Sequence, residues 1–455
     1  MALTAINPAN GNTIKTYRQT PFAKVIKRVE TAHQAFTVWK EMTLSQRTEL
    51  MKRASQILTK NKEEYATIMC LEMGKPIRQG RAEIEKCAWV CEYYADNALT
   101  MLQPEKIETD ASNSFVSFQP LGVVLAVMPW NYPFWQIFRF AAPGLMAGNA
   151  VVLKHASNVP GCSLAIEDIF KKAGFPENLF QNLLISSRQI KSVMGHPRIR
   201  AVTLTGSNSA GQAIAAGAGK LLKKSVLELG GNDPYIILED ADLESAAKTC
   251  VESRLLNSGQ SCIAAKRFVV VEDVRQRFED MFLEHMRAKK IGNPLEEDVD
   301  IGPLARFDLR ENLHRQVSQS IAKGAKCLLG GEIPTGKGAF YPATVLSAVR
   351  KGMPAYEDEI FGPVGAIISV KDEKEAIQVA NDSSFGLGGA IFTRDIKRGE
   401  RIATYELEAG CCFVNTFVRS DPRLPFGGIK SSGYGRELSH YGIKEFVNIK
   451  TVYVQ

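Results

Sequence analysis

Short runs of β-branched and apolar residues recur between helical stretches along most of this sequence. Because strands that alternate with helices assemble into parallel sheets covered on both faces, the pattern predicts an α/β fold of doubly wound sheets. A hydrophobic core stops growing at roughly 250–300 residues. A chain of 455 residues is therefore expected to form two such domains. The predicted strands cover residues 123–128, 150–154, 201–205, 226–229, 235–238, 268–271, 364–370 and 389–393.

The predicted limits of the two domains lie where the spacing of the apolar residues changes. Residues 21–102 carry Ala, Glu, Lys, Leu and Met at helical spacing, with a break at Gly74-Lys75-Pro76, and they precede the first strands. We predict a first domain over residues 1–105 and 122–230 and a second domain over residues 231–425.

Two further segments look like strands that lie outside both domains. Residues 107–118 and 451–454 alternate polar with apolar side chains, as strands with one exposed face do. Exposed strand edges need a partner. We therefore predict that residues 106–121 and 440–455 are oligomerisation strands of a homodimer or homotetramer.

Charge and cysteine content argue against several classes of protein. The 56 Lys and Arg against 49 Asp and Glu give a net charge of +7, but the basic residues are scattered, which disfavours a nucleic-acid partner. Nine cysteines, mostly isolated, favour a reduced, cytoplasmic location. We see no signal peptide, and the apolar run at 121–127 is too short to span a membrane, so we expect no membrane partner.

Two segments carry candidate catalytic side chains. Gly259 allows a tight turn that presents the thiol of Cys262, although one cysteine among nine is also commonly a buried small hydrophobe. Glu228 ends an apolar strand just before Gly230-Gly231, where burial would raise its pKa and suit it to act as a general base. A strand-end Glu that faces solvent is the alternative for this position.

Two other segments follow predicted strands and precede helices. In open parallel sheets ligands bind outside the carboxyl ends of the strands, which places the Asn131 amide near a ligand as an oxyanion donor. Asn131 is equally plausible as a turn residue. Thr205-Gly206-Ser207 leads into a helix whose start could hold a phosphate, or Ser207 could be an ordinary N-cap. The usual G-x-G-x-x-G fingerprint is absent there.

Taken together, these segments resemble the NAD(P)-dependent aldehyde dehydrogenase superfamily, and most of all its shorter microbial succinate-semialdehyde dehydrogenases. The resemblance runs from about residue 7 to the C-terminus. It implies a Rossmann-like cofactor-binding first domain and a catalytic second domain. The motifs that carry it are, in order, Pro129-Trp130-Asn131, Lys154, Thr205-Gly206-Ser207, Glu228-Leu229-Gly230-Gly231, Gly259-Gln260-Ser261-Cys262, Glu359-Ile360-Phe361-Gly362-Pro363 and Pro425-Phe426-Gly427-Gly428.

The resemblance implies a role for each catalytic candidate. Cys262 attacks the aldehyde as a thiolate and forms a thiohemiacetal, while Asn131 and the Cys262 backbone N–H hold the oxyanion. Transfer of hydride to the nicotinamide leaves a thioester, and Glu228 activates the water that hydrolyses it. The expected product is a free carboxylic acid.

The resemblance also implies the cofactor contacts. Lys154 reaches the adenosine ribose, Ser207 and the following helix start meet the pyrophosphate, and Glu359 binds the nicotinamide ribose. Members that prefer NAD commonly carry Glu three residues after this Lys; Ser157 stands there instead and accommodates a 2′-phosphate, so we expect NADP to be preferred over NAD. The full predicted set is Trp130, Lys154, Ser157, Thr205, Gly206, Ser207, Leu229, Glu359 and Phe361.

A helix predicted over 132–144 places Trp135 and Arg139 on one face. Succinate-semialdehyde dehydrogenases carry Arg at this position, and an Arg suits a bidentate grip on a distal carboxylate. Pairing of Arg139 with a helix neighbour is the alternative. Arg419, Ser420 and Ser261 complete the predicted substrate site. No His, Cys or Asp cluster has metal-ligand spacing, so we expect no metal.

The leading functional hypothesis is NAD(P)-dependent oxidation of succinate semialdehyde to succinate. Two alternatives stay open at this point. One is an aldehyde dehydrogenase of broader aliphatic or aromatic specificity, and the other is a binding protein of this fold that has lost turnover.

Overall fold

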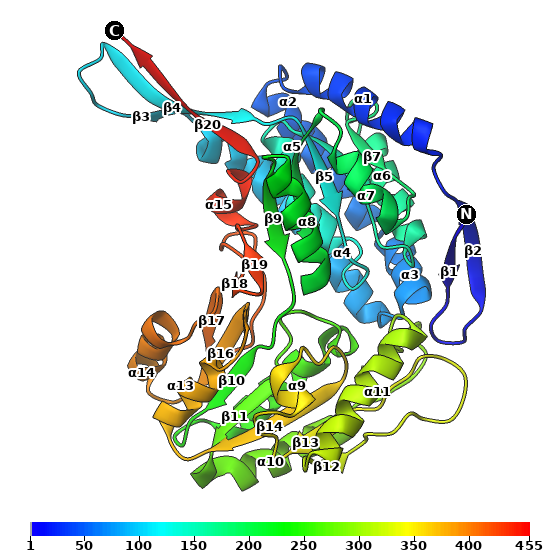
Figure 1. Cartoon of the computed structure of the whole chain (residues 1–455), viewed down its shortest axis with the longest axis vertical. Coiled ribbons are helices and arrows are strands. Elements are labelled where there is room, and N and C mark those ends of the chain that lie inside the picture. The colour runs from blue at the N-terminus through cyan, green and yellow to red at the C-terminus, as the bar shows by residue number, and fades with distance from the viewer. Residues whose placement is uncertain (1) are drawn as a thin grey trace.

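Two large, mostly parallel sheets lie one above the other in the computed structural model of the chain, which describes residues 2–455 (Figure 1). The predicted α/β fold is confirmed. The strands of both sheets are almost completely buried, as expected for sheets with helices on both faces.

The first sheet has the strand order β19-β9-β8-β5-β6-β7, and only its edge strand β19 is antiparallel to its neighbour. The chain adds β6 and β7 on one side of β5, and β8 and β9 on the other side. Because crossover connections are right-handed, this reversal in the order of the parallel strands leaves a crevice at the carboxyl ends of β5 and β8. Its strands are β5 (Val123–Val127), β6 (Ala150–Lys154), β7 (Phe180–Asn182), β8 (Ile199–Thr205), β9 (Lys224–Glu228) and β19 (Gly433–Tyr434).

Helices pack around this sheet, and the longest, α4, packs against α2, α3 and α5. Gly74 adopts a left-handed conformation (φ 78°) that ends α3, which explains the predicted break before Pro76. The helices are α1 (Phe22–Trp39), α2 (Leu44–Lys60), α3 (Lys62–Met73), α4 (Ile77–Leu102), α5 (Trp135–Met146), α6 (Pro160–Lys172), α7 (Ile190–Met194), α8 (Asn208–Lys220) and α15 (Ser439–Ile443).

The second sheet has the order β12-β13-β14-β11-β10-β16-β17, antiparallel only between β12 and β13. Its strands are β10 (Pro234–Ile237), β11 (Arg267–Val271), β12 (Lys326–Leu329), β13 (Thr344–Ser347), β14 (Val364–Val370), β16 (Gly388–Phe392) and β17 (Cys411–Val414). Its helices are α9 (Leu243–Leu255), α10 (Glu272–Arg287), α11 (Phe307–Ala322), α12 (Pro354–Glu357), α13 (Glu373–Asn381) and α14 (Ile396–Arg401).

The chain passes between the two sheets twice. It leaves the first sheet after β9 and enters the second at β10, so residues 229–233 form the crossing. It returns after β17, where β18 (Ile429–Lys430) pairs with β15 (Phe385–Gly386) and β19 pairs with β9. Both crossings lie beside the site described below.

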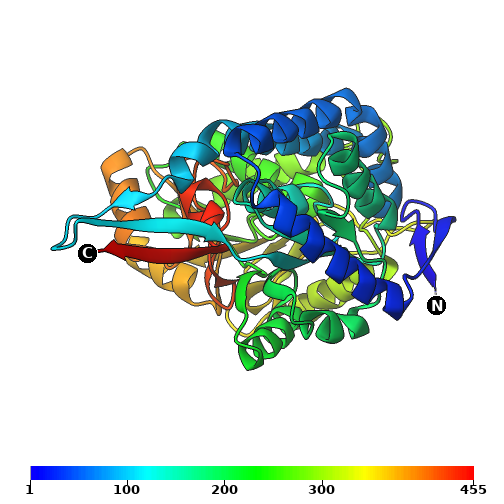
Figure 2. The same ribbon diagram turned by 90° about the horizontal axis from the view of Figure 1, so that it is seen from above.

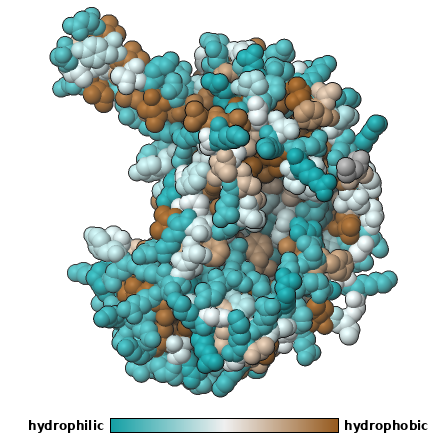
Figure 3. Space-filling model, in the orientation of Figure 1, coloured by the Kyte–Doolittle hydropathy of each residue, from teal (hydrophilic) through white to brown (hydrophobic). Residues whose placement is uncertain are grey.

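A three-stranded antiparallel arm projects from the body in both views (Figures 1 and 2). It is formed by β3 (Glu105–Lys106), β4 (Asn113–Pro120) and β20 (Val447–Val454), in the order β20-β4-β3. Hydrophobic residues gather on this arm in Figure 3. Ile449 of β20 is 62% exposed. A second hairpin of β1 (Ala2–Ile6) and β2 (Thr13–Arg18) precedes α1.

The structure corrects two of the sequence expectations. The helix predicted from residue 132 begins at Trp135, because the Glu83 carboxylate accepts the N–H groups of Phe134 and Trp135, both at 2.9 Å, and so caps the helix there. Of the predicted strand at 440–455, the first residues belong to the helix α15, and the strand β20 begins only at Val447. The short strands β7, β12, β13, β15, β18 and β19 and the N-terminal hairpin were not predicted. Within residues 2–455, no helix is both long enough and apolar enough to cross a membrane.

Candidate functional site

The loop that carries Cys262 is strongly constrained by its backbone. A short 3-10 turn follows α9, and its residues Asn257 and Ser258 both have φ 55°, followed by Gly259 at φ 75°. A β-carbon at Gly259 would overlap the carbonyl of Gly362. Only glycine fits this left-handed position in close contact with the 359–363 segment, so two of the sequence motifs pack directly on each other.

A buried cation holds the same loop from behind. The ammonium of Lys266 donates to the carbonyl oxygens of Ser261 (3.1 Å), Cys262 (2.6 Å) and Ala264 (3.1 Å). Arg254 adds a bond of 2.6 Å to the Gly259 carbonyl. Lys266 was not singled out from the sequence; a lysine that enters an apolar strand four residues after the candidate nucleophile is the signal that could have found it.

The Cys262 thiol is half-buried. Burial raises the pKa of this thiol to about 12, while the positive charges of Arg139 and Lys266 act in the opposite direction. Cys262 is therefore a protonated thiol at neutral pH in this arrangement.

Asn131 lies in the loop after β5 and joins the Cys262 loop directly. Its side-chain amide nitrogen donates to the backbone carbonyl of Gln260 at 3.2 Å. The backbone carbonyl of Asn131 accepts from the side-chain amide of Asn257 at 2.7 Å. The neighbouring His155 accepts from the Ala156 N–H and so donates from Nε2 to the Pro133 carbonyl at 3.0 Å. His155, whose pKa burial lowers to about 4, fixes the other end of the Asn131 loop as a neutral ring.

Two cavities share Cys262 as a lining residue. The first has a volume of about 360 Å³ and lies at the carboxyl ends of β5, β8 and β9. It contains seven of the nine residues predicted for the cofactor, and Asn131 as well: Trp130, Asn131, Thr205, Gly206, Ser207, Leu229, Glu359 and Phe361.

Lys154 and Ser157 do not line this cavity. Lys154 ends β6 and is buried, and burial lowers the pKa of its ammonium. Ser157 is exposed in the turn between β6 and α6. These two predicted cofactor residues therefore lie outside the lining of the cavity, at the end of β6 and in the turn that follows it.

The edge of the first cavity suits an anionic group, and its wall carries a carboxylate that can accept hydrogen bonds. The first turn of α8 starts at its edge, with Ser207 as the N-cap, and free N–H groups at a helix start attract phosphate. The Glu359 carboxylate accepts from the Gly231 N–H at 3.0 Å and lies 3.8 Å from the Lys266 ammonium. Burial raises the pKa of Glu359, and Lys266 opposes this shift.

The second cavity has a volume of about 270 Å³ and lies between α4, α5 and the 417–426 segment. It contains all five residues predicted for the substrate: Trp135, Arg139, Ser261, Arg419 and Ser420. It also contains Phe426 of the last sequence motif, and residues that were not predicted for the site, namely Gln79, Ala82, Glu83, Lys86, Tyr132, Gln136, Leu256, Ile263, Phe417 and Val418.

Arg139 is already engaged by partners from other parts of the chain. Its guanidinium is paired with the buried Glu437 carboxylate, lies 3.4 Å from the Thr205 hydroxyl and lies 4.6 Å from the centre of the Phe426 ring. The charge of Arg139 is therefore balanced by a residue far away in the sequence and not by a helix neighbour.

Glu228 lines neither cavity. It ends β9 with 2% exposure, and neither carboxylate oxygen has a hydrogen-bond partner among residues 2–455. Burial raises the pKa of Glu228 well above its ordinary value; Glu437 adds to this, while Arg139 and Arg436 oppose it. Its surroundings therefore disfavour the charged carboxylate.

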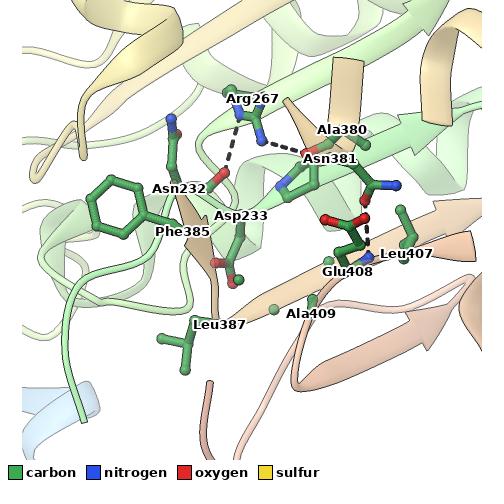
Figure 4. A pocket seen from close by; sticks show the side chains of 14 residues that line it. Asn232, Asp233, Arg267, Ala380, Asn381, Phe385, Leu387, Leu407, Glu408 and Ala409 are labelled. Atoms are coloured by element: carbon green, nitrogen blue, oxygen red, sulfur yellow. Dashed lines mark hydrogen bonds between the residues drawn. The ribbon is translucent and has the colours of Figure 1, made fainter. Parts of the chain in front are cut away.

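The segment that joins the two sheets is tied down by Arg267, at the start of β11. Its guanidinium donates to the carbonyl oxygens of Asn232 (3.1 Å) and Ala380 (2.8 Å), as Figure 4 shows. The adjoining cavity beside Asp233 measures only about 10 Å³, so it has no room for more than a water molecule. Within residues 2–455, no three His, Cys, Asp or Glu side chains are grouped to hold a metal ion.

Comparisons with known proteins agree on one family. The sequence profile of the aldehyde dehydrogenase family matches residues 1–452. The chain is 49% identical to a probable succinate-semialdehyde dehydrogenase [NADP(+)] of Synechocystis sp. (strain ATCC 27184 / PCC 6803 / Kazusa), and all of both chains is covered. It is 45% identical to a succinate-semialdehyde dehydrogenase [NADP(+)] of Mycobacterium avium (strain 104), with 100% of this chain and 97% of the relative covered.

A solved structure shows the same arrangement of the chain. The succinic semialdehyde dehydrogenase of Streptococcus pyogenes, solved in complex with NADP+, superposes with a TM-score of 0.97 at 38% identity, and all of both chains is covered.

Proposed function

The chain belongs to the aldehyde dehydrogenase family, and from that premise we propose that it oxidises succinate semialdehyde to succinate, with NADP as the preferred hydride acceptor and NAD as a poorer one. The observation that carries the proposal is the position of Cys262, which lines both cavities. A thiol there can hold a substrate carbon from one side and expose it to a cofactor on the other.

The residues of the first cavity fit such a cofactor. Free N–H groups at the α8 start and Ser207 meet phosphate oxygens, the Glu359 carboxylate accepts from a ribose hydroxyl, and Trp130 with Phe361 forms an apolar wall. When bound, the nicotinamide supplies the acceptor for the hydride of the aldehyde carbon. Lys154 and Ser157 would hold the adenosine ribose and its 2′-phosphate beyond that cavity.

The chemistry begins at Cys262. The Sγ atom adds to the aldehyde carbon, its proton leaves to solvent, and the carbonyl oxygen becomes an oxyanion. The free N–H of the Asn131 amide and the Cys262 backbone N–H stabilise that charge. Loss of hydride from the carbon then leaves a thioester on Cys262.

Glu228 completes the reaction as the general base. Its buried position disfavours the charged form, and the group lines neither cavity, so it acts as a base when it is ionised and turned toward the thioester, where it takes a proton from water. The hydroxide equivalent that results breaks the C–S bond and releases succinate and the thiol.

The test is an aldehyde panel run with both cofactors. We expect a kcat/KM for succinate semialdehyde at least about tenfold above that for butanal, because one charge-assisted contact to the distal carboxylate is worth this much. Equal values for the two aldehydes would leave a broad aldehyde dehydrogenase, and absence of turnover despite cofactor binding would leave a binding protein.

The cofactor preference has its own test at Ser157. We expect Ser157→Glu to move the NADP to NAD ratio toward NAD by about tenfold or more, because a carboxylate repels a 2′-phosphate and accepts from a 2′-hydroxyl. An unchanged ratio would contradict the placement of the adenosine ribose at this turn.

Three further features of the protein belong to the same proposal. Residues 1–105 and 122–230 form the cofactor-binding domain, and residues 231–425 form the catalytic domain. The exposed β20 edge and apolar side chains of the arm support a homodimer or homotetramer. Nine free thiols support a reduced, cytoplasmic location.

A further inference from the structure

One face of α4 forms a wall of the second cavity. Gln79, Ala82, Glu83 and Lys86 are spaced by three, one and three residues, which brings all four side chains to the same side of the helix. No spacing rule links this helix to the site, because α4 lies about 170 residues before Cys262 in the chain.

Lys86 is the cation on that face. Its ammonium donates to the Ser420 hydroxyl at 2.8 Å and lies 4.3 Å from the centre of the Trp135 ring. Within residues 2–455 it forms no ion pair with a carboxylate. A cation that is withdrawn from water without a counter-ion is unfavourable, and an incoming anion relieves that cost.

The other two cations of the cavity are placed differently. Arg139 is neutralised by Glu437, and Arg419 is exposed to solvent. The Ser420 oxygen accepts from Lys86, so its own hydroxyl proton stays free to donate to a second acceptor. Lys86 and Ser420 together therefore offer two donors, side by side, on the wall of a cavity that also contains Cys262.

We propose that Lys86 is the residue that selects a carboxylate-bearing aldehyde, by pairing with the distal carboxylate while Ser420 donates to the same group. The inference rests on the proposed function and assigns its substrate recognition to a residue of α4.

The surroundings of Lys86 make this recognition dependent on pH. Burial, and to a smaller extent the charge of Arg139, lower the pKa of the Lys86 ammonium to about 8. The charged and titratable groups that face it are Glu83 and Cys87 from α4, Arg139 from α5, and Arg419 and Asp421 from the return segment. The ammonium binds a carboxylate below this pKa and loses the charge above it.

The experiment compares kcat/KM for succinate semialdehyde and butanal in four forms of the full-length enzyme: wild type, Lys86→Met, Lys86→Arg and Lys248→Met. Met keeps the length of the side chain without the charge, and Arg restores the charge. Lys248 is exposed on α9 and lines neither cavity, so its variant controls for the loss of a lysine.

We expect Lys86→Met to lose at least about tenfold in kcat/KM for succinate semialdehyde, through KM, and to keep its butanal activity within about twofold. Lys86→Arg should retain most of the preference. A wild-type ratio in Lys86→Met would overturn the inference while leaving the proposed function intact, whereas a wild type that does not prefer succinate semialdehyde would overturn both.

A measurement on the wild type alone covers the case in which Lys86→Met does not fold. We expect KM for succinate semialdehyde to rise by about tenfold between pH 7 and pH 9, because only the protonated lysine binds the carboxylate. The KM for butanal should stay flat over this range. Parallel behaviour of the two KM values would overturn the inference.

Discussion

The two groups that the proposed reaction needs most, the Cys262 thiol and the Glu228 carboxyl, lie in contrasting surroundings. The Cys262 loop is held at several points, by Lys266 on three carbonyls and by the contact of Gly259 with Gly362. The Glu228 carboxyl has no hydrogen-bond partner on either oxygen. The loop of the first group is held by several contacts, whereas no hydrogen bond within residues 2–455 holds the second group.

The contrast has a physical reason in the order of events. A nucleophile must meet its carbon in a narrow range of geometry, which rewards a rigid loop. A base that acts only after the thioester has formed must stay away from the first step. Gly427 leaves the space for it, since a β-carbon there would lie 2.8 Å from Glu228 Oε1.

The largest effect is expected from removal of the first group. Cys262→Ala should lower the rate of NADPH formation by at least about 10⁴-fold, because no other thiol lines either cavity among residues 2–455. Fluorescence titration with NADP, which the variant should still bind, serves as the control. Oxidation at a rate near that of the wild type would remove the covalent step from the mechanism.

Removal of the second group should give a smaller and kinetically different loss. Glu228→Gln is expected to lower steady-state turnover by about 10²–10⁴-fold, because the amide cannot accept the proton of the attacking water. The first turnover should survive as a burst of NADPH, since Cys262 still reacts. A variant without a burst would show that Glu228 also serves the first step.

The pH dependence sharpens the same comparison. Burial raises the pKa of Glu228, so the base form becomes abundant only at a higher pH than for an ordinary carboxyl. Steady-state turnover of the wild type should therefore increase toward alkaline pH, and in Glu228→Gln the residual steady-state rate should lose that part of the profile. The burst rate, which reports the Cys262 thiol, should keep its own rise with pH in both proteins.

The difference between the two groups also explains how much of the fold and of the site could be predicted from the sequence. The α/β fold and the family are confirmed, and the segment around Cys262 was found because its backbone demands particular residues. Gly259 has to be glycine, and it packs on a second glycine-containing motif. Such requirements leave a local signature, whereas an unpartnered carboxylate leaves none beyond its place at the end of a strand.

The contacts between side chains across the substrate cavity could not be predicted from such local requirements. Lys86 meets Ser420, and Arg139 meets Glu437, across separations of about 300 residues that only the fold closes. The same limit applied to the missed strands: β7 spans only Phe180–Asn182, too short to display a period of two. No regular spacing in the sequence predicts side-chain pairs between distant segments.

The smallest effect tests whether the rigidity of the Cys262 loop matters in itself. Lys266→Met leaves three buried carbonyl oxygens without their donor, each a loss of about 1–3 kcal/mol if unrelieved, and should lower the melting temperature. We expect kcat/KM to fall by about 10–100-fold, through misplacement of the thiol. The fall should be equal for succinate semialdehyde and butanal, in contrast to Lys86→Met.

The same variant gives a readout that a purely structural role would not move. Lys266 lowers the pKa of the Cys262 thiol against the effect of burial, so its loss should shift the pH dependence of alkylation by iodoacetamide to higher pH. Lys266→Arg keeps the charge and should hold the alkylation profile near that of the wild type. If Lys266→Met reacted with iodoacetamide at the wild-type pH and oxidised both aldehydes at wild-type rates, the Cys262 loop would not depend on its buried cation, and the contrast with Glu228 would lose its physical basis.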